Sequence, residues 1–146
     1  MAPTATDGVN GTKSNAPKSV LTISLARYLH GHDVADFIAK DWDAKATPEQ
    51  QSRFDNQGFN LDPDDVDGTL AALKDRLQEK KWDGVLVGWC SRGNTKFTVL
   101  FEKVVNEVVR EVVRREQDGS DGDQHLKLMF SDGPDDLVNT TFRAFG

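Results

Sequence analysis

The spacing of hydrophobic residues along this chain changes period several times and predicts strands that alternate with helices. Residues 19–25 alternate between apolar and polar and are rich in β-branched side chains, so we expect a first strand there. Residues 82–89 contain an unbroken apolar stretch at 84–88, which is typical of a strand buried on both faces. Residues 125–130 alternate again, and residues 58–61 fit a short further strand.

Apolar residues three and four positions apart predict the helices, over residues 34–42, 69–80 and 134–145 and most clearly over 97–113. A short polar helix begins where Thr47 precedes Pro48, and Phe54 is its main candidate for the core. Residues 27–33 are predicted to be a polar connection.

Strands that alternate with helices usually pair in parallel. We therefore expect an α/β fold, a small three-layer sandwich with a four-stranded, mainly parallel sheet, either flavodoxin-like or receiver-like. Ligands of such sheets bind beyond the carboxyl ends of the strands. This rule selects the segments after Leu25, Trp89 and Phe130, with the segment after Leu61 as a further candidate.

The composition adds a division of the chain into a tail and one domain. Residues 1–18 hold almost no large apolar side chain, so we expect a disordered tail there and a single α/β domain over 19–146. The tail lacks the apolar run of a signal peptide, and no stretch approaches the roughly 20 apolar residues of a membrane span. A single cysteine fits a reducing compartment, and we expect a cytoplasmic protein.

The net charge of −6 argues against nucleic acid or an anionic membrane as a partner. Locally, Arg110, Arg114 and Arg115 gather at one helix end. They either complement the helix dipole, which is the favoured interpretation, or form a binding patch.

The segment from residue 90 to residue 95 is the main candidate site, because it joins a buried strand to the start of a helix. We expect the backbone N–H groups of this turn, the Ser91 hydroxyl, the Arg92 guanidinium and Asn94 to form a cradle for a carboxylate or phosphate. In the alternative interpretation, Asn94 or Thr95 only caps the helix and Arg92 is solvated.

Cys90 is a candidate nucleophile, since a helix start and a neighbouring arginine would both lower its pKa. The phosphatase spacing is not met, because the sixth residue after Cys90 is Lys96, and no nucleotide-binding glycine pattern occurs. A simply buried cysteine is the more common case.

His30 and His32 are candidates for proton transfer or substrate contact, with Arg27 beside them. A metal site needs a third ligand, and His125 is expected on the opposite edge, so we predict no metal. We also predict no cofactor. The acidic run 62–67 lacks the acid that a calcium loop requires at its twelfth position and is predicted to be a solvated helix entry.

Glu102 and Asn106 lie one helical turn apart, and Ser131 follows the last strand. We expect either that Glu102 orients Arg92 through a charge-assisted hydrogen bond or that both helical residues are simply solvated.

Residues 84–88, Arg92, the stretch 101–106 and the pair Pro134 and Asp136 resemble motifs of a family of small uncharacterised flavodoxin-like α/β proteins of fungi and bacteria. The resemblance covers residues 82–145 well and 19–80 weakly. It departs at Cys90, where the family has glycine, and at Ser131, where it has asparagine. The resemblance implies no activity, but Arg92, Glu102 and Asn106 match its pattern.

These observations favour a protein that binds an anionic or carbonyl-bearing small molecule at the carboxyl edge of the sheet, with Arg92 as the anion anchor. Such a protein fits an accessory or tailoring enzyme of the isomerase, lyase or hydrolase type. The alternative is a non-catalytic binding or regulatory module, dimeric through the 97–113 helix. A pocket lined by Arg27, His30, Cys90, Arg92 and Ser131 would support the first interpretation.

Overall fold

The computed structural model describes residues 16–119 and 124–146 and confirms the α/β fold. Its four strands are β1 (Lys18–Ser24), β2 (Phe54–Asn60), β3 (Gly84–Val87) and β4 (Lys127–Phe130). All neighbouring strands pair in parallel, in the order β2-β1-β3-β4, which is the flavodoxin-like arrangement. Most of the expected tail lies outside the described residues, and Lys18, which we assigned to the tail, begins β1.

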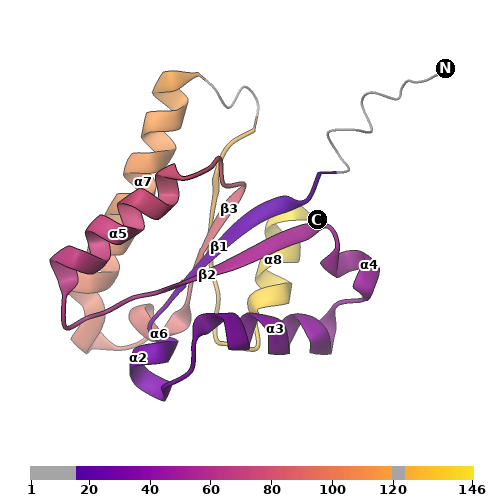
Figure 1. Ribbon diagram of the computed structural model, residues 1–146, viewed down its shortest axis with the longest axis horizontal. Helices are drawn as coiled ribbons and strands as arrows, with labels where there is room; N and C mark the ends of the chain where they lie inside the picture. The colour runs from indigo at the N-terminus through magenta and orange to yellow at the C-terminus, as the bar shows by residue number, and fades with distance from the viewer. Residues whose placement is uncertain (1–15, 120–123) are drawn as a thin grey trace.

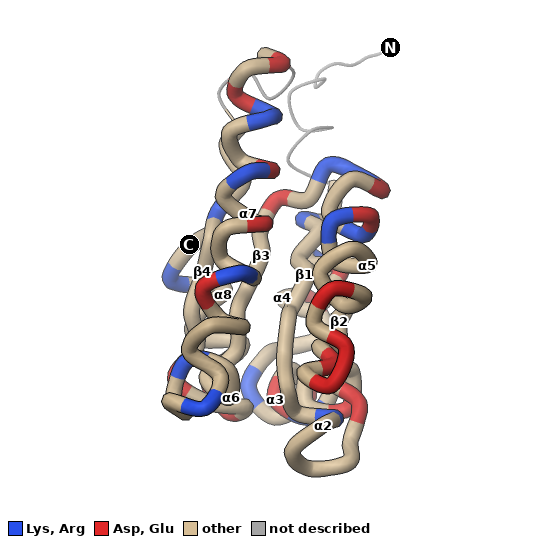
Figure 2. The backbone as a smooth tube through the Cα atoms, turned by 90° about the vertical axis from the view of Figure 1, so that its left-hand side faces the viewer, with Lys and Arg blue, Asp and Glu red and all other residues tan. Residues whose placement is uncertain are grey.

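Helices cover both faces of the sheet and complete a three-layer sandwich (Figure 1). On one face lie α5 (Val66–Gln78) and α7 (Thr98–Asp118), and on the other lie α3 (Val34–Lys45) and α8 (Leu137–Phe145). Figure 2 shows acidic and basic residues interleaved along α7, as the exposed side of a surface helix requires.

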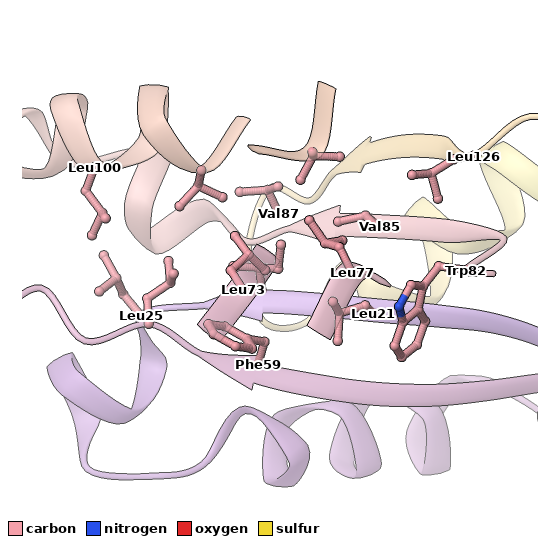
Figure 3. Close-up of a cluster of buried hydrophobic side chains, with 14 of the residues drawn as sticks. Leu21, Leu25, Phe59, Leu73, Leu77, Trp82, Val85, Val87, Leu100 and Leu126 are labelled. Carbon is pink, nitrogen blue, oxygen red and sulfur yellow. The ribbon is translucent and has the colours of Figure 1, made fainter. Parts of the chain in front are cut away.

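The alternation of side chains along each strand produces two separate cores. Leu21 and Val85 point toward α5 and α7, where they join the larger cluster drawn in Figure 3. Val20 and Leu86 point toward α3 and α8 and join the smaller cluster with Trp42. Residues of one strand that are two positions apart therefore face the same helix layer.

The prediction for residues 47–61 was partly wrong. The short helix is present as α4 (Pro48–Gln51), with Thr47 and Gln50 forming a capping box. Phe54, however, begins strand β2 and contacts Trp42 and the aromatic residues of α8 instead of belonging to a helix.

Two short helices at the carboxyl ends of the strands were also not predicted. Residues 27–33, expected to be a polar connection, include α2 (Ala26–His30), which ends at Gly31 in the left-handed conformation with φ 75°. The expected turn at 90–94 is largely helix α6 (Trp89–Arg92), followed by a 3-10 helix, η2 (Thr95–Phe97). Both short helices lie at the end of the molecule where the strands finish (Figure 1).

The arginines near the end of α7 form structural ion pairs. The Arg115 side chain is buried, binds the buried Glu111 carboxylate and donates to the Trp82 carbonyl oxygen. Arg114 also binds Glu111, and the exposed Arg110 binds Glu107. Arg115 lies in the last turn of α7, as the helix-dipole interpretation held, but it is buried in these bonds and is not part of a binding patch. No helix among the described residues is long and apolar enough to cross a membrane.

Candidate functional site

A cavity of about 450 Å³ opens where the carboxyl ends of β1, β3 and β4 meet α3 and α8. Its floor consists of residues that point toward the α3 and α8 layer but are too small to fill it: Thr22 and Ser24 of β1, Gly88 after β3, and Ser131 after β4. The alternation that buries Val20, Leu86 and Met129 in the same layer places these residues beyond them. Small side chains at the strand ends thus leave the cavity unfilled.

The walls come from four helices and one loop, and most are apolar. They are lined by Ala26 and His30 of α2, Val34 and Phe37 of α3, Trp89 and Cys90 of α6, Gly133 and Pro134 of the β4–α8 loop, and Leu137 of α8. None of these lining residues is a lysine, an arginine or a carboxylic acid. His30 is the one histidine among these lining residues.

Ser131 gives the cavity its most specific polar group. The residue is fully buried, and its Oγ has no hydrogen-bond partner. Within residues 16–119 and 124–146, no other buried side-chain nitrogen or oxygen lacks one. The Ser24 hydroxyl, by contrast, accepts a hydrogen bond from the Ala26 amide at 2.9 Å. A buried hydroxyl without a partner costs free energy, so the Ser131 hydroxyl calls for an explanation.

Trp89 forms part of the wall although 43% of its surface is exposed. Its indole ring lies against the backbone of Gly93, where a Cβ atom would come within 2.1 Å of the ring. Gly93 is therefore required for this position of the tryptophan ring, although its own φ of −85° is ordinary.

Arg92 does not line the cavity, because its guanidinium is bound to the loop that follows β4. Its Nη2 donates to the Ser131 carbonyl oxygen at 2.9 Å and lies 3.4 Å from Asp132 Oδ1. The guanidinium also lies over the ring of Trp89, 4.9 Å from its centre. The expected pair between Arg92 and Glu102 is not formed, since Glu102 is exposed on α7 and Arg92 has these other partners.

Cys90 does line the cavity, but its pKa moves in the opposite direction from the one we expected. Partial burial raises the pKa of the thiol, because the thiolate would lose solvation. The expected lowering by a helix start and a nearby arginine is therefore wrong. Helix α6 is only one turn long, and the Arg92 guanidinium is held by Ser131 and Asp132.

Local hydrogen bonds occupy part of the expected cradle of backbone N–H groups and the amide next to it. The Gly93 amide donates to the Trp89 carbonyl oxygen, and the Lys96 amide donates to the Asn94 side chain. Asn94 thus caps η2, as the alternative interpretation held. Ser91 is buried, and its hydroxyl donates to the Gly88 carbonyl oxygen at 3.3 Å.

Of the two candidate histidines, His30 lines the cavity and His32 does not. Both imidazoles lie near the ring of Phe37, 6.4 and 6.3 Å from its centre. Arg27 is exposed and outside the cavity, and its charge contributes to lowering the pKa of Asp33. The structure therefore brings together His30, Cys90 and Ser131 from the expected pocket.

The remaining candidates lie elsewhere. Asn106 is exposed on α7, away from the cavity. In the acidic run, Asp65 caps α5 by accepting from the Gly68 amide at 3.1 Å, which confirms a helix entry. No group of three potential metal ligands is close enough to hold an ion in the described part of the chain.

Sequence reasoning missed Thr22, Ser24, Gly88 and Trp89 as site residues. The sequence could have indicated Thr22, Ser24 and Gly88, which are small or hydroxylic residues near a strand end. They lie on the sheet face opposite the residues that fill the larger core. The position of Trp89 depends on Gly93, four residues later, and that signal was not recognised.

Comparison of the chain with protein-family models, curated proteins and solved structures gives no match. The resemblance to a flavodoxin-like family therefore stays a prediction. The proposal that follows rests on the cavity alone.

Proposed function

We propose that this protein binds a small uncharged molecule, with an apolar body and one carbonyl or hydroxyl group, in the cavity between α3 and α8. The observation that carries the proposal is the unpartnered, fully buried hydroxyl of Ser131 in the cavity floor. A ligand oxygen that accepts from this hydroxyl would remove the cost of leaving it unpaired.

The size and lining of the cavity support this ligand class. A volume of about 450 Å³ lies within the range of roughly 300–1,000 Å³ found for small-molecule sites. Phe37, Trp89 and Pro134 offer flat apolar surface to the body of a ligand. The sequence favoured an anionic or carbonyl-bearing ligand. Of these two classes we keep the uncharged one, because Arg92, the expected anion anchor, is bound to Ser131 and Asp132.

Binding without chemistry has more support than catalysis. A cysteine acts as a nucleophile in its thiolate form, usually activated by an adjacent base. The raised pKa of the Cys90 thiol disfavours the thiolate, and the imidazole of His30 lies against the Phe37 ring.

The test uses three probes of similar size: acetophenone, ethylbenzene and benzoate. Cys90 is the only cysteine, so its rate of alkylation reports occupancy of the cavity, and quenching of the partly exposed Trp89 gives a second signal. We expect acetophenone to bind about three- to tenfold more tightly than ethylbenzene, the value of one hydrogen bond, and benzoate to bind least.

Two variants and a control locate the site. Ser131→Ala should remove the advantage of acetophenone over ethylbenzene. Gly88→Leu should abolish binding, because Gly88 has an ordinary φ of −73° and a side chain there would enter the cavity. Ser52→Ala, at an exposed serine that bonds only within its own turn, should change neither. If no probe slows alkylation of Cys90, or if Ser131→Ala keeps the preference for acetophenone, the proposal is wrong.

A further inference from the structure

Arg92 is held on three sides although it is not among the residues that line the cavity. The Trp89 ring lies under its guanidinium at 4.9 Å and the Phe130 ring lies at 5.9 Å, measured to the ring centres. Asp132 pairs with it at 3.4 Å. Only about a third of its side-chain surface remains exposed. An arginine fixed in this way presents its N–H groups in one direction.

That direction is the backbone of Ser131. The Ser131 carbonyl oxygen accepts from Arg92 at 2.9 Å, whereas its amide donates to the Val87 carbonyl oxygen over a longer 3.4 Å. Strand β4 ends at Phe130, so Ser131 is the first residue beyond the sheet ladder. The bond from Arg92 is therefore the shorter of the two that hold its backbone.

We propose that Arg92 is a positioning residue: it fixes the backbone of Ser131 so that the unpartnered hydroxyl projects into the cavity. This role in ligand selection rests on the proposed function, in which the Ser131 hydroxyl donates a hydrogen bond to a ligand oxygen. Arg92 acts through Ser131 and makes no contact with the ligand. The sequence-based role of Arg92 as an anion anchor would require the opposite, a guanidinium that faces the ligand.

The matched control is Arg143. Its Nη2 donates to the carbonyl oxygen of Phe130 at 3.1 Å, one residue before Ser131, and Arg143 is likewise an arginine at the surface. Phe130 packs against Phe101 of α7 instead of lining the cavity. Arg143→Met thus removes the same kind of bond from the carbonyl oxygen of Phe130, a residue whose side chain does not line the cavity.

The first measurement needs no ligand. The coupling constants between the Hα and Hβ protons of Ser131 report whether its side chain holds one rotamer. We expect one rotamer in the wild type and in Arg143→Met, and averaging between rotamers in Arg92→Met. Arg92→Lys, which can still donate to the Ser131 carbonyl oxygen, should recover part of the order. A single Ser131 rotamer in a folded Arg92→Met protein would overturn the inference, whatever the ligand.

The second measurement is a double-substitution cycle on the affinity ratio of acetophenone to ethylbenzene. Arg92→Met should lower the ratio from about three- to tenfold toward one. In the Ser131→Ala background it should not change the ratio further, because the group it positions is gone. An equal effect in both backgrounds would show that Arg92 acts directly and overturn the inference. A wild-type protein that binds neither probe would contradict the proposed function but leave the rotamer result standing.

Discussion

Single side chains determine the character of this cavity, because a change of one residue in its floor alters either its volume or a fully buried hydroxyl without a partner. Gly88 contributes space and Ser131 contributes a hydroxyl without a partner. Cys90 contributes apolar surface, since burial favours the neutral thiol. The lining is therefore mostly apolar, with the Ser131 hydroxyl as its one fully buried side-chain group without a partner in the described residues.

The raised pKa of Cys90 predicts slow alkylation at neutral pH. The thiolate is the reactive form, so the rate of alkylation by iodoacetamide should rise at a higher pH in the folded protein than in the urea-unfolded chain. A group whose pKa is raised on folding stabilises the fold below its unfolded pKa, and this stability is lost as the pH increases through the folded pKa. Identical pH profiles for the folded and unfolded chains would contradict the assignment of Cys90 to an apolar wall.

At this scale the sequence predicted three of the side chains that meet in the cavity, His30, Cys90 and Ser131, because all three lie near strand ends. It could not predict their surroundings. The partner of Arg92 is a backbone carbonyl 39 positions away, and no residue type in the sequence marks a carbonyl as an acceptor. Of the two alternatives for Glu102, the exposed, solvated helix face is the one that the structure has, and Arg92 pairs with the loop after β4.

Among the elements, α7 is the one best predicted from the sequence. Its apolar residues recur at helical spacing, and Leu100, Val104 and Val108 are buried against α5 and the sheet. The end of the helix was misread, because Glu111 and Arg115 continue the buried stripe as an ion pair. Val109 and Val113 stay exposed, and dimerisation through this helix stays a prediction.

Arg115→Met should lower the free energy of unfolding by about 3 kcal/mol, the lower end of the range for breaking a buried pair. Removal of the guanidinium leaves the Trp82 carbonyl oxygen unpaired, whereas Arg114 still binds Glu111. Arg110→Met is the control: its side chain is 72% exposed, and loss of its pair with Glu107 should cost less than about 1 kcal/mol. Urea unfolding measures both, and equal effects would contradict a structural role for Arg115.

Strand β2 shows why the weaker elements escaped prediction. Its residues include Asp55, Asn56 and Gln57, which give no apolar alternation. The strand exists because all seven of its residues pair in register with β1, a long-range interaction that local pattern does not reveal. Phe54 is partly buried because this pairing brings it against Trp42 of α3 and the aromatic residues of α8.

For the molecule as a whole, the two helix layers differ in how completely they are filled. Between the sheet and the α5 and α7 layer, large side chains such as Leu73, Leu77 and Trp82 form a continuous core (Figure 3). On the α3 and α8 face the core stops short of the strand ends, and the cavity occupies the remaining space. The buried Asp41 of α3 joins the two helices of this layer by accepting from the Val138 amide at 2.9 Å.

Helices α3 and α8, two of the four that border the cavity, each follow an aspartate whose pKa is lowered. At α3, the Ala35 amide donates to Asp33, and this bond, together with Asn60, lowers its pKa. At α8, burial alone would raise the pKa of Asp136, but hydrogen bonds from the Asp132 amide and the Thr140 hydroxyl outweigh it, and the net shift is downward.

The cavity end of the molecule should therefore be sensitive to acid. A carboxyl group whose pKa is lowered on folding contributes stability that is present above its unfolded pKa of about 4 and is lost as the pH falls through the folded value. Between pH 5 and pH 3, roughly, we expect the free energy of unfolding to fall less steeply in Asp33→Asn and Asp136→Asn than in the wild type. Asparagine keeps a side-chain oxygen that accepts these hydrogen bonds but does not titrate. Asp75→Asn on the exposed side of α5 controls for the loss of one charge, and a wild-type slope in all three variants would show that neither Asp33 nor Asp136 is responsible for the acid sensitivity.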